Sequence, residues 1–529
     1  MLKKFHYSQL AESKYLFYFV LVLNVVLLCF TRFYPSMDGP AHLYNSNILN
    51  HLIRGNTTLS EFYSINTVPI PNWTSHFLLS IFHIVLPAWL AEKALLVLYV
   101  SGMAFSFRFL IKELNPENIP LSILIFPFIY SFLFHLGFYN FSISFILFFT
   151  TLGFWLRSQS DEKIYNYFIL LLLITITYFS NVLVFGFLGL SIGLYILYFV
   201  FTAYSNNKNT ASSIRFGSKK LLVLFLVSIP SLTFLMIFYT NVTFFPSGQN
   251  YPVKELVKWI NDARPFIVYN YVGEEIITEQ FFHVLLVLVA ISFFLKNKVR
   301  EKGQYHNIRK ADIISIPLFI STVLLFIIPN GSSAGMMSDR YCLMIFMLGL
   351  IWIVSRAIPG KLNPILVCIV LTLHIGLLFK HLNGTIRKLD ADAVTINKAE
   401  SYIVENSIVL PINLSDNWLE SHFSNYLGVD KPMIILENYE ASTGWFPIKW
   451  NSENIPNVLL GDKNSISGIH WISNSNSEKI RQINDILLYG NTSKINDPNW
   501  KELKELLSSD FKLKYNAENN YVMLYEKIL

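Results

Sequence analysis

The chain has 529 residues, of which 53% are hydrophobic and only 14% are charged. This balance excludes an ordinary soluble fold, so a lipid bilayer is the expected solvent for most of the chain. The net charge of +6 conceals an asymmetry, because acidic residues outnumber basic ones after residue 386. The basic excess therefore lies earlier in the chain, as is typical of the cytoplasmic loops of membrane proteins.

Apolar stretches long enough to cross about 30 Å of hydrocarbon need roughly 17 to 25 helical residues. The sequence predicts about 11 such spans, near residues 15–34, 89–111, 119–136, 138–156, 165–181, 182–204, 220–241, 280–296, 311–329, 341–356 and 362–380. The first follows several lysines, and no small-residue cleavage site follows it. We therefore expect a true span with its N-terminus in the cytoplasm and not a signal peptide.

The segment 73–87 decides the topology, because WTSHFLLSIFHIVLP is short for a span and ends in Pro87. If it crosses the membrane, most of the basic clusters fall outside; if it lies in the interface, they fall inside. The positive-inside bias favours a juxtamembrane helix, with a short crossing as the alternative. The loops 35–88 and 242–279 then face outward, together with everything after about residue 385.

The chain changes character after residue 385. The runs SIVLPINL, KPMIILENY, VLLGDKNSISGIHWI and NNYVMLYEKIL are separated by Asn, Asp, Gly and Ser and predict strands. Helical patterns lie at 391–405, 477–488 and 499–508. The predicted fold class is a polytopic α-helical membrane protein with a C-terminal α/β soluble domain. We place the transmembrane domain at residues 1–385 and the extracytoplasmic domain at residues 386–529.

The first outward loop opens with YPSMDGPAHLY. Pro40 suits the first turn of a helix, so an amphipathic helix is predicted to run to about Arg54, with Asp38 just before it and His42 one turn in. A carboxylate at a helix start tends to stay ionised and is able to accept a proton from an attacking hydroxyl. The alternative is that Asp38 caps the helix and His42 is an interfacial residue.

A second constellation is the Gly/Ser-rich outward loop PNGSSAGMMSDRY, which leads into a span. Arg340 is well placed there to hold a lipid-linked phosphate, because its guanidinium binds two phosphate oxygens while the lipid tail stays in the bilayer. Two alternatives stay open. In the first, Asp339 and Arg340 pair with each other; in the second, Arg340 binds the headgroups of ordinary membrane lipids.

Two tight turns, at 135–140 and 178–181, are predicted on the same outward side. Their amides and hydroxyls make Tyr139, Asn140 and Asn181 candidates for lining a cavity, together with His42 and Asp339. The alternative is turn chemistry that joins closely packed spans. The aromatics of loop 242–279 either form a platform for a sugar or seat the loop in the interface.

The C-terminal stretch contains a dense polar and aromatic patch, formed by residues 437–441 and 445–447 with His422 and Asn425 upstream. We expect this patch to pack the soluble domain on the membrane portion, and we assign no catalysis to it. The chain has no GxGxxG, P-loop, CxxC or HExxH pattern. Nucleotide cofactors, structural zinc and zinc proteolysis therefore have no support.

One acidic residue after the first span, followed by Pro40, a membrane-parallel helix, many spans and an outward soluble domain, resembles the GT-C superfamily of membrane glycosyltransferases. The likeness is to the bacterial branch with protein O-mannosyltransferase-like and lipid A aminoarabinose transferase-like proteins, and to relatives with a DGPAH-type first loop. It covers about residues 10 to 385 in architecture, with Asp38 to His42 and the later arginine as its motif. Many members carry a pair of acidic residues in the first loop, whereas Gly39 follows Asp38 here and the next acid is Glu61. A requirement for a divalent metal is therefore left open.

The resemblance implies an inverting glycosyltransferase that moves a hexosyl or pentosyl group from a polyprenyl-phosphate donor to an extracytoplasmic lipid, glycan or protein. Asp38 would be catalytic and Arg340 would bind the donor phosphate. The expected place is a bacterial cytoplasmic (inner) membrane, with membrane lipids as partners, no nucleic acid and no metal assigned. The alternatives are a non-catalytic transporter or flippase for lipid-linked saccharides, which needs charges buried in its spans, and a membrane scaffold.

Overall fold

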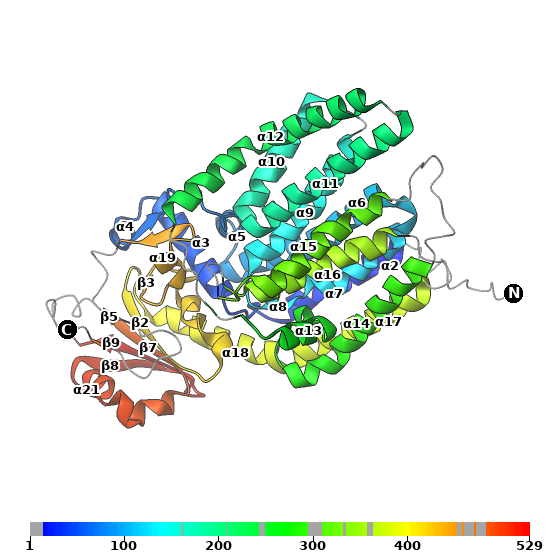
Figure 1. Ribbon diagram of the computed structural model, residues 1–529. Helices are drawn as coiled ribbons and strands as arrows, with labels where there is room; N and C mark the ends of the chain where they lie inside the picture. The colour runs from blue at the N-terminus through cyan, green and yellow to red at the C-terminus, as the bar shows by residue number, and fades with distance from the viewer. Residues whose placement is uncertain are drawn as a thin grey trace. The chain divides into compact units, whose positions relative to one another are not determined.

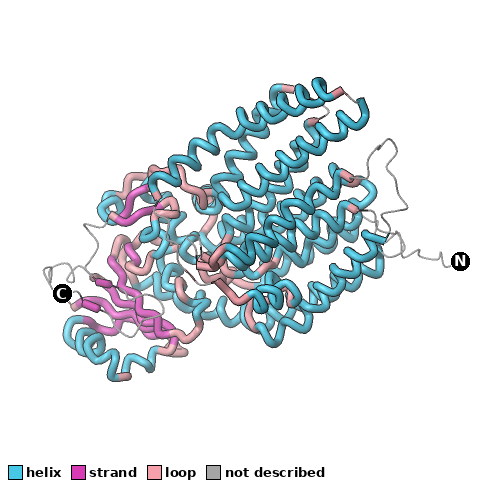
Figure 2. Tube along the Cα trace, viewed as in Figure 1, coloured by secondary structure: helices cyan, strands magenta, loops and turns pink. Residues whose placement is uncertain are grey.

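The computed structural model describes residues 14–159, 161, 163–207, 209–242, 248, 250–294, 309–331, 335–356, 363–451, 458, 459, 470, 471 and 483–528. Its residues divide into two compact units. The helical unit comprises Met1–Leu27, Val97–His135 and Asn140–His381. The mixed unit comprises Leu28–Leu96, Leu136–Tyr139 and Leu382–Leu529. Figures 1 and 2 show that nearly all of the strands belong to the later part of the chain, in the mixed unit.

Long apolar helices make up the helical unit (Figure 1). They are α2 (Lys14–Leu27), α6 (Ala88–Leu114, which begins in the mixed unit), α9 (Tyr139–Ser158), α10 (Ile164–Ser180), α11 (Val182–Asn207), α12 (Thr210–Asn241), α14 (Tyr271–Phe294), α15 (Ser315–Ile327), α16 (Met337–Ser355) and α17 (Asn363–His381). Shorter elements connect them: η2 (Pro116–Ile125), α7 (Phe126–Ile129), α8 (Phe132–His135), α13 (Val253–Asn261), η3 (Arg264–Phe266) and η5 (Lys310–Ile314). Helices α10, α11 and α12 lie side by side.

In the described part of the chain, 8 helices are long and apolar enough to cross a membrane, and three shorter apolar helices accompany them, at Lys14–Phe30, Pro116–Ile129 and Ile164–Ser180. They correspond to the apolar stretches expected from the sequence, so the polytopic helical class is confirmed. The expected continuous span at 119–136 is wrong in detail. It is divided into η2, α7 and α8: Pro120 lies inside η2, where it lacks the N–H that an α-helix requires, and α7 ends before Tyr130.

The core of the mixed unit is a five-stranded sheet with strand order β3-β2-β7-β9-β8. Its strands are β2 (Ile408–Leu414), β3 (Ile434–Ile435), β7 (Asp485–Gly490), β8 (Phe511–Asn516) and β9 (Val522–Lys527). Strand β2 runs parallel to β3 and β7, while β9 runs antiparallel to β7 and β8. Nearly every residue of β2 and β7 is buried, as expected for central strands covered on both faces. Helices α18 (Arg387–Ala399) and α21 (Lys501–Asp510) belong to the same unit.

Most of the predicted elements after residue 385 are confirmed. Three of the strand-like runs contain β2, β3 and β9, and the patterns at 391–405 and 499–508 overlap α18 and α21. The predicted helix at 477–488 is wrong over 485–488, which form β7, and residues 477–482 lie outside the described residues. The run DILLYG becomes a strand because it pairs with β2 on one side and with β9 on the other, and this central position buries all of it. In the run 458–472, short strands β5 (Val458–Leu459) and β6 (His470–Trp471) pair antiparallel.

The first loop belongs to the same compact unit as the C-terminal sheet. It forms α3 (Gly39–Ile53), α4 (Thr57–Phe62), β1 (Tyr63–Ile65) and α5 (Thr74–His83). Strand β1 pairs antiparallel with β4 (Ile448–Trp450), where the rings of Tyr63 and Trp450 stack at 4.4 Å. The hydroxyl of Tyr44 on α3 donates to the Met433 carbonyl at 2.8 Å. The sequence did not predict these long-range contacts, and the boundary at residue 385 stays a prediction.

Helix α5 occupies the segment that decides the topology. It has 10 residues, which corresponds to a length of about 15 Å, roughly half the thickness of the hydrocarbon core. It packs against α3, where Asn50 Nδ2 donates to the Ser80 carbonyl at 3.0 Å. A helix of this length supports the expectation of a juxtamembrane segment.

Candidate functional site

Asp38 lies at the N-terminal end of α3, but its side chain makes no capping hydrogen bond to the helix. The hydroxyl of Ser36 accepts from the Gly39 N–H instead, at 3.1 Å. The backbone N–H of Asp38 donates to the Leu136 carbonyl at 2.9 Å, which fixes the residue against the turn before α9. With 8% of its surface exposed, Asp38 is a buried carboxylate that serves some purpose other than capping.

Two glycines explain why a second acidic residue is absent here. A Cβ atom at Gly39 would overlap the Ser36 hydroxyl and lie 2.7 Å from the Tyr139 hydroxyl. Gly137 has a φ of +90°, and a Cβ there would lie 2.6 Å from the backbone nitrogen of Gly39. The two backbone segments approach so closely that a side chain at position 39 has no room.

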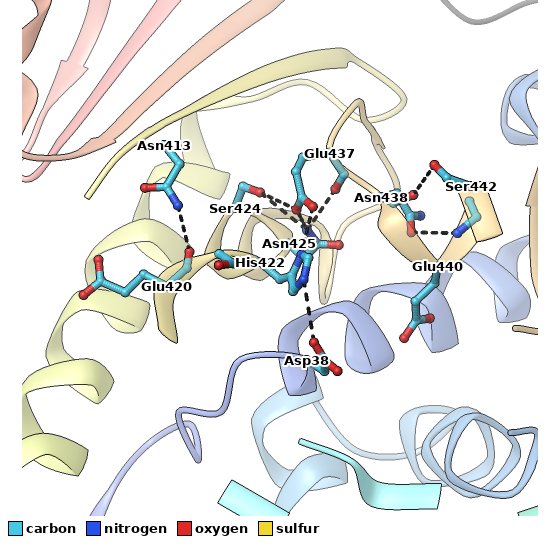
Figure 3. A network of polar contacts seen from close by, with 12 residues as sticks. Asp38, Asn413, Glu420, His422, Ser424, Asn425, Glu437, Asn438, Glu440 and Ser442 are labelled. Atoms are coloured by element: carbon cyan, nitrogen blue, oxygen red, sulfur yellow. Dashed lines mark hydrogen bonds and ion pairs between the residues drawn. The ribbon is translucent and has the colours of Figure 1, made fainter. Parts of the chain in front are cut away.

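His422 stands between two carboxyl groups (Figure 3). Its Nε2 atom lies 3.6 Å from Oδ1 of Asp38, and its Nδ1 atom lies 2.8 Å from Oε1 of Glu437. The other oxygen of Glu437 accepts from Asn425 Nδ2 at 2.7 Å and from the Ser424 hydroxyl at 3.3 Å. A chain of polar groups therefore runs from the C-terminal segment to the first-loop aspartate.

Glu437 determines which nitrogen of His422 carries a proton. Burial raises the pKa of Glu437 to about 8, and the hydrogen bonds from Ser424 and Asn425 only partly oppose this rise. At neutral pH the carboxyl is therefore largely protonated and donates from Oε1 to Nδ1 of His422. The remaining proton of a neutral imidazole lies on Nε2, so an N–H group faces Asp38 and favours its ionised form.

Aromatic side chains lie around the carboxylate of Asp38. The ring of Tyr439 lies 4.2 Å from that of His422, between ring centroids. Burial and then the charge of Asp38 raise the pKa of the Tyr439 phenol well above its usual value, so it stays neutral. Tyr139 is buried, its hydroxyl is 3.1 Å from that of Ser36, and it donates to Glu92 at 3.3 Å.

A second cluster consists of His42 on α3, His76 on α5 and Glu440 on α19 (Tyr439–Thr443), all of them buried. Nδ1 of His42 is in contact with Oε1 of Glu440, and Nε2 of His76 lies 2.8 Å from Oε2. The other nitrogen of each ring faces a backbone carbonyl. Nε2 of His42 lies 3.0 Å from the carbonyl oxygen of Gly137, and Nδ1 of His76 lies 3.2 Å from the carbonyl oxygen of Asn72. The three converging ligand atoms lie within 4.8 Å of one another.

Burial and charge act in opposite directions in this cluster. Burial is the largest single effect and lowers the pKa of His42, but the charge and hydrogen bond of Glu440, the charge of Asp38 and the Gly137 carbonyl together outweigh it, so the net shift is upward. Burial raises the pKa of Glu440, but the nearby His76 and His42 outweigh it and bring the value to about 2. Glu440 is therefore an anion, and the cluster is built to hold positive charge beside it.

The remaining sequence-predicted residues belong to the helical unit. Asp339 forms an ion pair with Arg264, at 3.3 Å. Arg340 is 9% exposed, donates from Nε to the Gly335 carbonyl at 3.1 Å, and its guanidinium lies 5.0 Å from the centre of the Phe141 ring.

Asn140 and Asn181 differ in what their side chains do. Asn140 is buried at the start of α9. Oδ1 of Asn181 accepts from the backbone N–H groups of Leu183 at 3.0 Å and Val184 at 3.3 Å, so it caps α11. Turn chemistry, which was the alternative for this residue, is thus observed at Asn181.

Sequence reasoning noticed the patch that contains His422, Glu437 and Glu440 but assigned it to packing, and it did not pair His76 with any residue. The available signal was the pair of glutamates three residues apart in an apolar and aromatic stretch. Buried carboxylates are rare unless they have partners, and here the partners are supplied by α3, α5 and the segment 422–425.

Fold and site together define a polytopic membrane protein with a buried carboxylate–histidine site in its mixed unit. No protein-family model matches the chain, and no curated protein matches its sequence. The chain is similar to the crystal structure of ArnT from Cupriavidus metallidurans in the apo state, at 10% sequence identity, over 97% of each chain and with a TM-score of 0.45.

Proposed function

We propose that this protein is a membrane glycosyltransferase of the GT-C type, which transfers a sugar from a polyprenyl-phosphate donor to an acceptor outside the cytoplasmic membrane. The observation that carries the proposal is the environment of Asp38. Its carboxylate is buried, is not used to cap α3, and is backed by the polar chain through His422 to Glu437. A carboxylate in this setting is suited to act as a general base.

In the proposed reaction, a hydroxyl of the acceptor attacks the anomeric carbon of the donor. The hydroxyl proton passes to Asp38, the new glycosidic bond forms, and the bond between the anomeric carbon and the phosphate oxygen breaks. The polyprenyl phosphate leaves with the electron pair of that bond. Attack opposite the leaving group inverts the anomeric configuration, which the stereochemistry of the product reveals.

The donor phosphate gains negative charge as it leaves, and a cation must stabilise it. Arg340 is the proposed partner, because it is a buried arginine in the first turn of α16, next to the loop that precedes this helix. An arginine also matches the geometry of phosphate oxygens better than a lysine does. Tyr139, Asn140 and His42 remain proposed lining residues, whereas the capping role of Asn181 weakens its candidacy.

A transporter of lipid-linked saccharides is the second candidate, because His381 and Glu274 form a buried pair at 3.0 Å in the helical unit. Glu274, however, also accepts from the backbone N–H groups of Val268 at 2.7 Å and Asn270 at 3.0 Å. These bonds fix the loop before α14, so the pair serves local structure. This weakens the case for a path of mobile charge.

The test uses the purified full-length protein in lipid nanodiscs with a panel of polyprenyl-phosphate sugars. A rise in thermal stability identifies the donor, and release of polyprenyl phosphate measures turnover. Asp38→Asn should lower turnover by about 10²- to 10⁴-fold while leaving the donor-induced stabilisation intact. The matched control is Asp416→Asn, since Asp416 is an exposed aspartate of the same unit. Undiminished turnover in Asp38→Asn overturns the proposal, and movement of the donor between leaflets without release of polyprenyl phosphate favours the transporter.

A further inference from the structure

The cluster of His42, His76 and Glu440 has an unusual arrangement of hydrogens. A backbone carbonyl only accepts, so the nitrogens that face Gly137 and Asn72 must carry N–H groups. In neutral imidazoles the other two nitrogens then present lone pairs. Both lone pairs point at the Glu440 carboxylate, which is itself an acceptor.

Such an arrangement is repulsive unless positive charge lies between the groups. Two protons, one on each ring, would place two imidazolium cations with ring centroids 4.8 Å apart in a site without solvent. Their mutual repulsion is large at low dielectric. A single divalent cation bound by both nitrogens and the carboxylate places the positive charge between the ligand atoms, so that the lone pairs bind it and neither ring has to become an imidazolium cation.

A second observation points to the same conclusion. Among the described residues, Nδ1 of His42 and Oε1 of Glu440 are buried polar atoms with no hydrogen bond of acceptable geometry. Both are aimed into the cluster, where they contact each other as an ion pair. Buried polar atoms are nearly always satisfied, so two unsatisfied atoms directed at one point indicate a ligand there.

The surroundings are those of a metal-ligand set. Each histidine is oriented by a backbone carbonyl, and Glu440 is oriented by Asn45, whose Nδ2 donates to Oε2 at 2.7 Å. Outer contacts of this kind fix the tautomer and direction of ligating side chains. The ring of Phe446 packs 5.9 Å from that of His42 and 5.8 Å from that of His76, which excludes water on one side.

We propose that His42, His76 and Glu440 bind one divalent transition-metal ion, Zn²⁺ first among them, which joins α3, α5 and α19. Two imidazole nitrogens and one carboxylate oxygen are preferred zinc ligands, whereas Mg²⁺ and Ca²⁺ prefer oxygen ligands alone. The ion is structural: it holds the helix that begins at Asp38 against the segment that supplies Glu437. No group on the ion takes part in sugar transfer.

The test measures metal in the full-length protein purified without chelator. The wild type should contain about one equivalent of zinc by mass spectrometry, and Co²⁺ exchanged into the site should show the visible absorption of a tetrahedral centre. His76→Asn and Glu440→Gln should lower the metal content at least tenfold. Chelation should lower the melting temperature of the wild type but not of these variants, and added Zn²⁺ should restore it.

The matched control is His83→Asn, which removes a histidine of the same helix that pairs with a single carboxylate, Asp430, at 3.3 Å. This variant should keep its metal, and so should Asp38→Asn, whose loss of turnover therefore reports on catalysis alone. If His76→Asn does not fold, the Co²⁺ spectrum of the wild type still decides. A wild type without bound metal and without a Co²⁺ spectrum, or His76→Asn with unchanged metal content, overturns the proposal.

Discussion

Nε2 of His422 lies 3.6 Å from Oδ1 of Asp38, although the two residues come from opposite ends of the chain. The distance suits electrostatic support and is slightly long for a hydrogen bond, as is common before a substrate is bound. Glu437 holds the other ring nitrogen at 2.8 Å, so in the proposed reaction we assign His422 the part of a positioning residue for Asp38.

Replacing His422 should therefore slow turnover without abolishing it. His422→Asn should lower kcat by about 10- to 100-fold and leave the KM for the donor nearly unchanged, because the variant removes support from the base and not from the donor. It should also move the acidic limb of the pH–rate profile upward, since Asp38 loses a neighbouring N–H. Steady-state kinetics across pH check this. An unchanged kcat and profile would assign His422 to packing alone.

Glu437 should impose a pH dependence on stability. Its pKa is raised from 4.5 to about 8 in the folded protein, so between these values the folded state holds a proton that the unfolded state has lost. The free energy of unfolding contributed by this group therefore falls as pH rises from about 4.5 to about 8. The titratable groups that face it are His422 and Glu440.

Glu437→Gln should flatten that slope, because a glutamine amide does not titrate. Its amide is also able to donate to His422 Nδ1, so turnover should remain within about threefold of the wild type, whereas Glu437→Ala should resemble His422→Asn. Thermal unfolding from pH 5 to 8 and turnover at pH 7 measure both effects. Equal slopes in wild type and Glu437→Gln would contradict the assignment.

Gly137 should tolerate no side chain. Gly137→Ala combines a positive φ with a Cβ placed 2.6 Å from the Gly39 backbone nitrogen, so the two segments must separate. We expect a loss of roughly 2 to 4 kcal/mol in the free energy of unfolding and a large loss of turnover. Gly189→Ala is the control, because that helical glycine has open space around its Cβ position. Similar stability of the two variants in thermal unfolding would refute the close approach.

Arg340 should determine donor affinity. Arg340→Gln should raise the KM for the lipid-linked donor by roughly 10- to 100-fold, the magnitude of one or two charge-assisted hydrogen bonds, and Arg340→Lys should recover little of it. Arg54→Gln, at an exposed arginine that ends α3, should leave the KM unchanged. Measuring turnover against donor concentration gives the KM of each variant. Equal KM values for the Arg340 variants and the wild type would show that Arg340 does not bind the donor.

The proposed orientation is testable by labelling. In a variant without Cys29, Cys342 and Cys368, a cysteine at position 416 should react with a membrane-impermeant maleimide added outside intact cells, whereas one at position 215 should not. The physical reason is the basic cluster around Arg215 on α12, which favours the cytoplasmic side. The reverse labelling pattern would invert the topology and place the candidate site inside the cell.

The sequence predicted most of the helices, because apolar length and the position of Pro40 are local signals. It predicted β2 and β9 from alternation, but not β7, whose apolar residues fit a helix and a central strand equally well. Local sequence patterns could not predict the partners of Asp38 and His42. His422 and Glu440 become neighbours of the first loop only through the pairing of β1 with β4 and the anchoring of α3, and spacing along the chain carries no record of such contacts.

The pairing of β1 with β4 has a consequence for biogenesis. Residues 63–65 are synthesised more than 380 residues before their partners at 448–450. Until these residues are made, β1 in the first loop has no partner strand, and His42 and His76 lack Glu440. The candidate site is therefore incomplete until residues 422–450 have been synthesised, and truncation before residue 422 should abolish its assembly even when every membrane helix has been inserted.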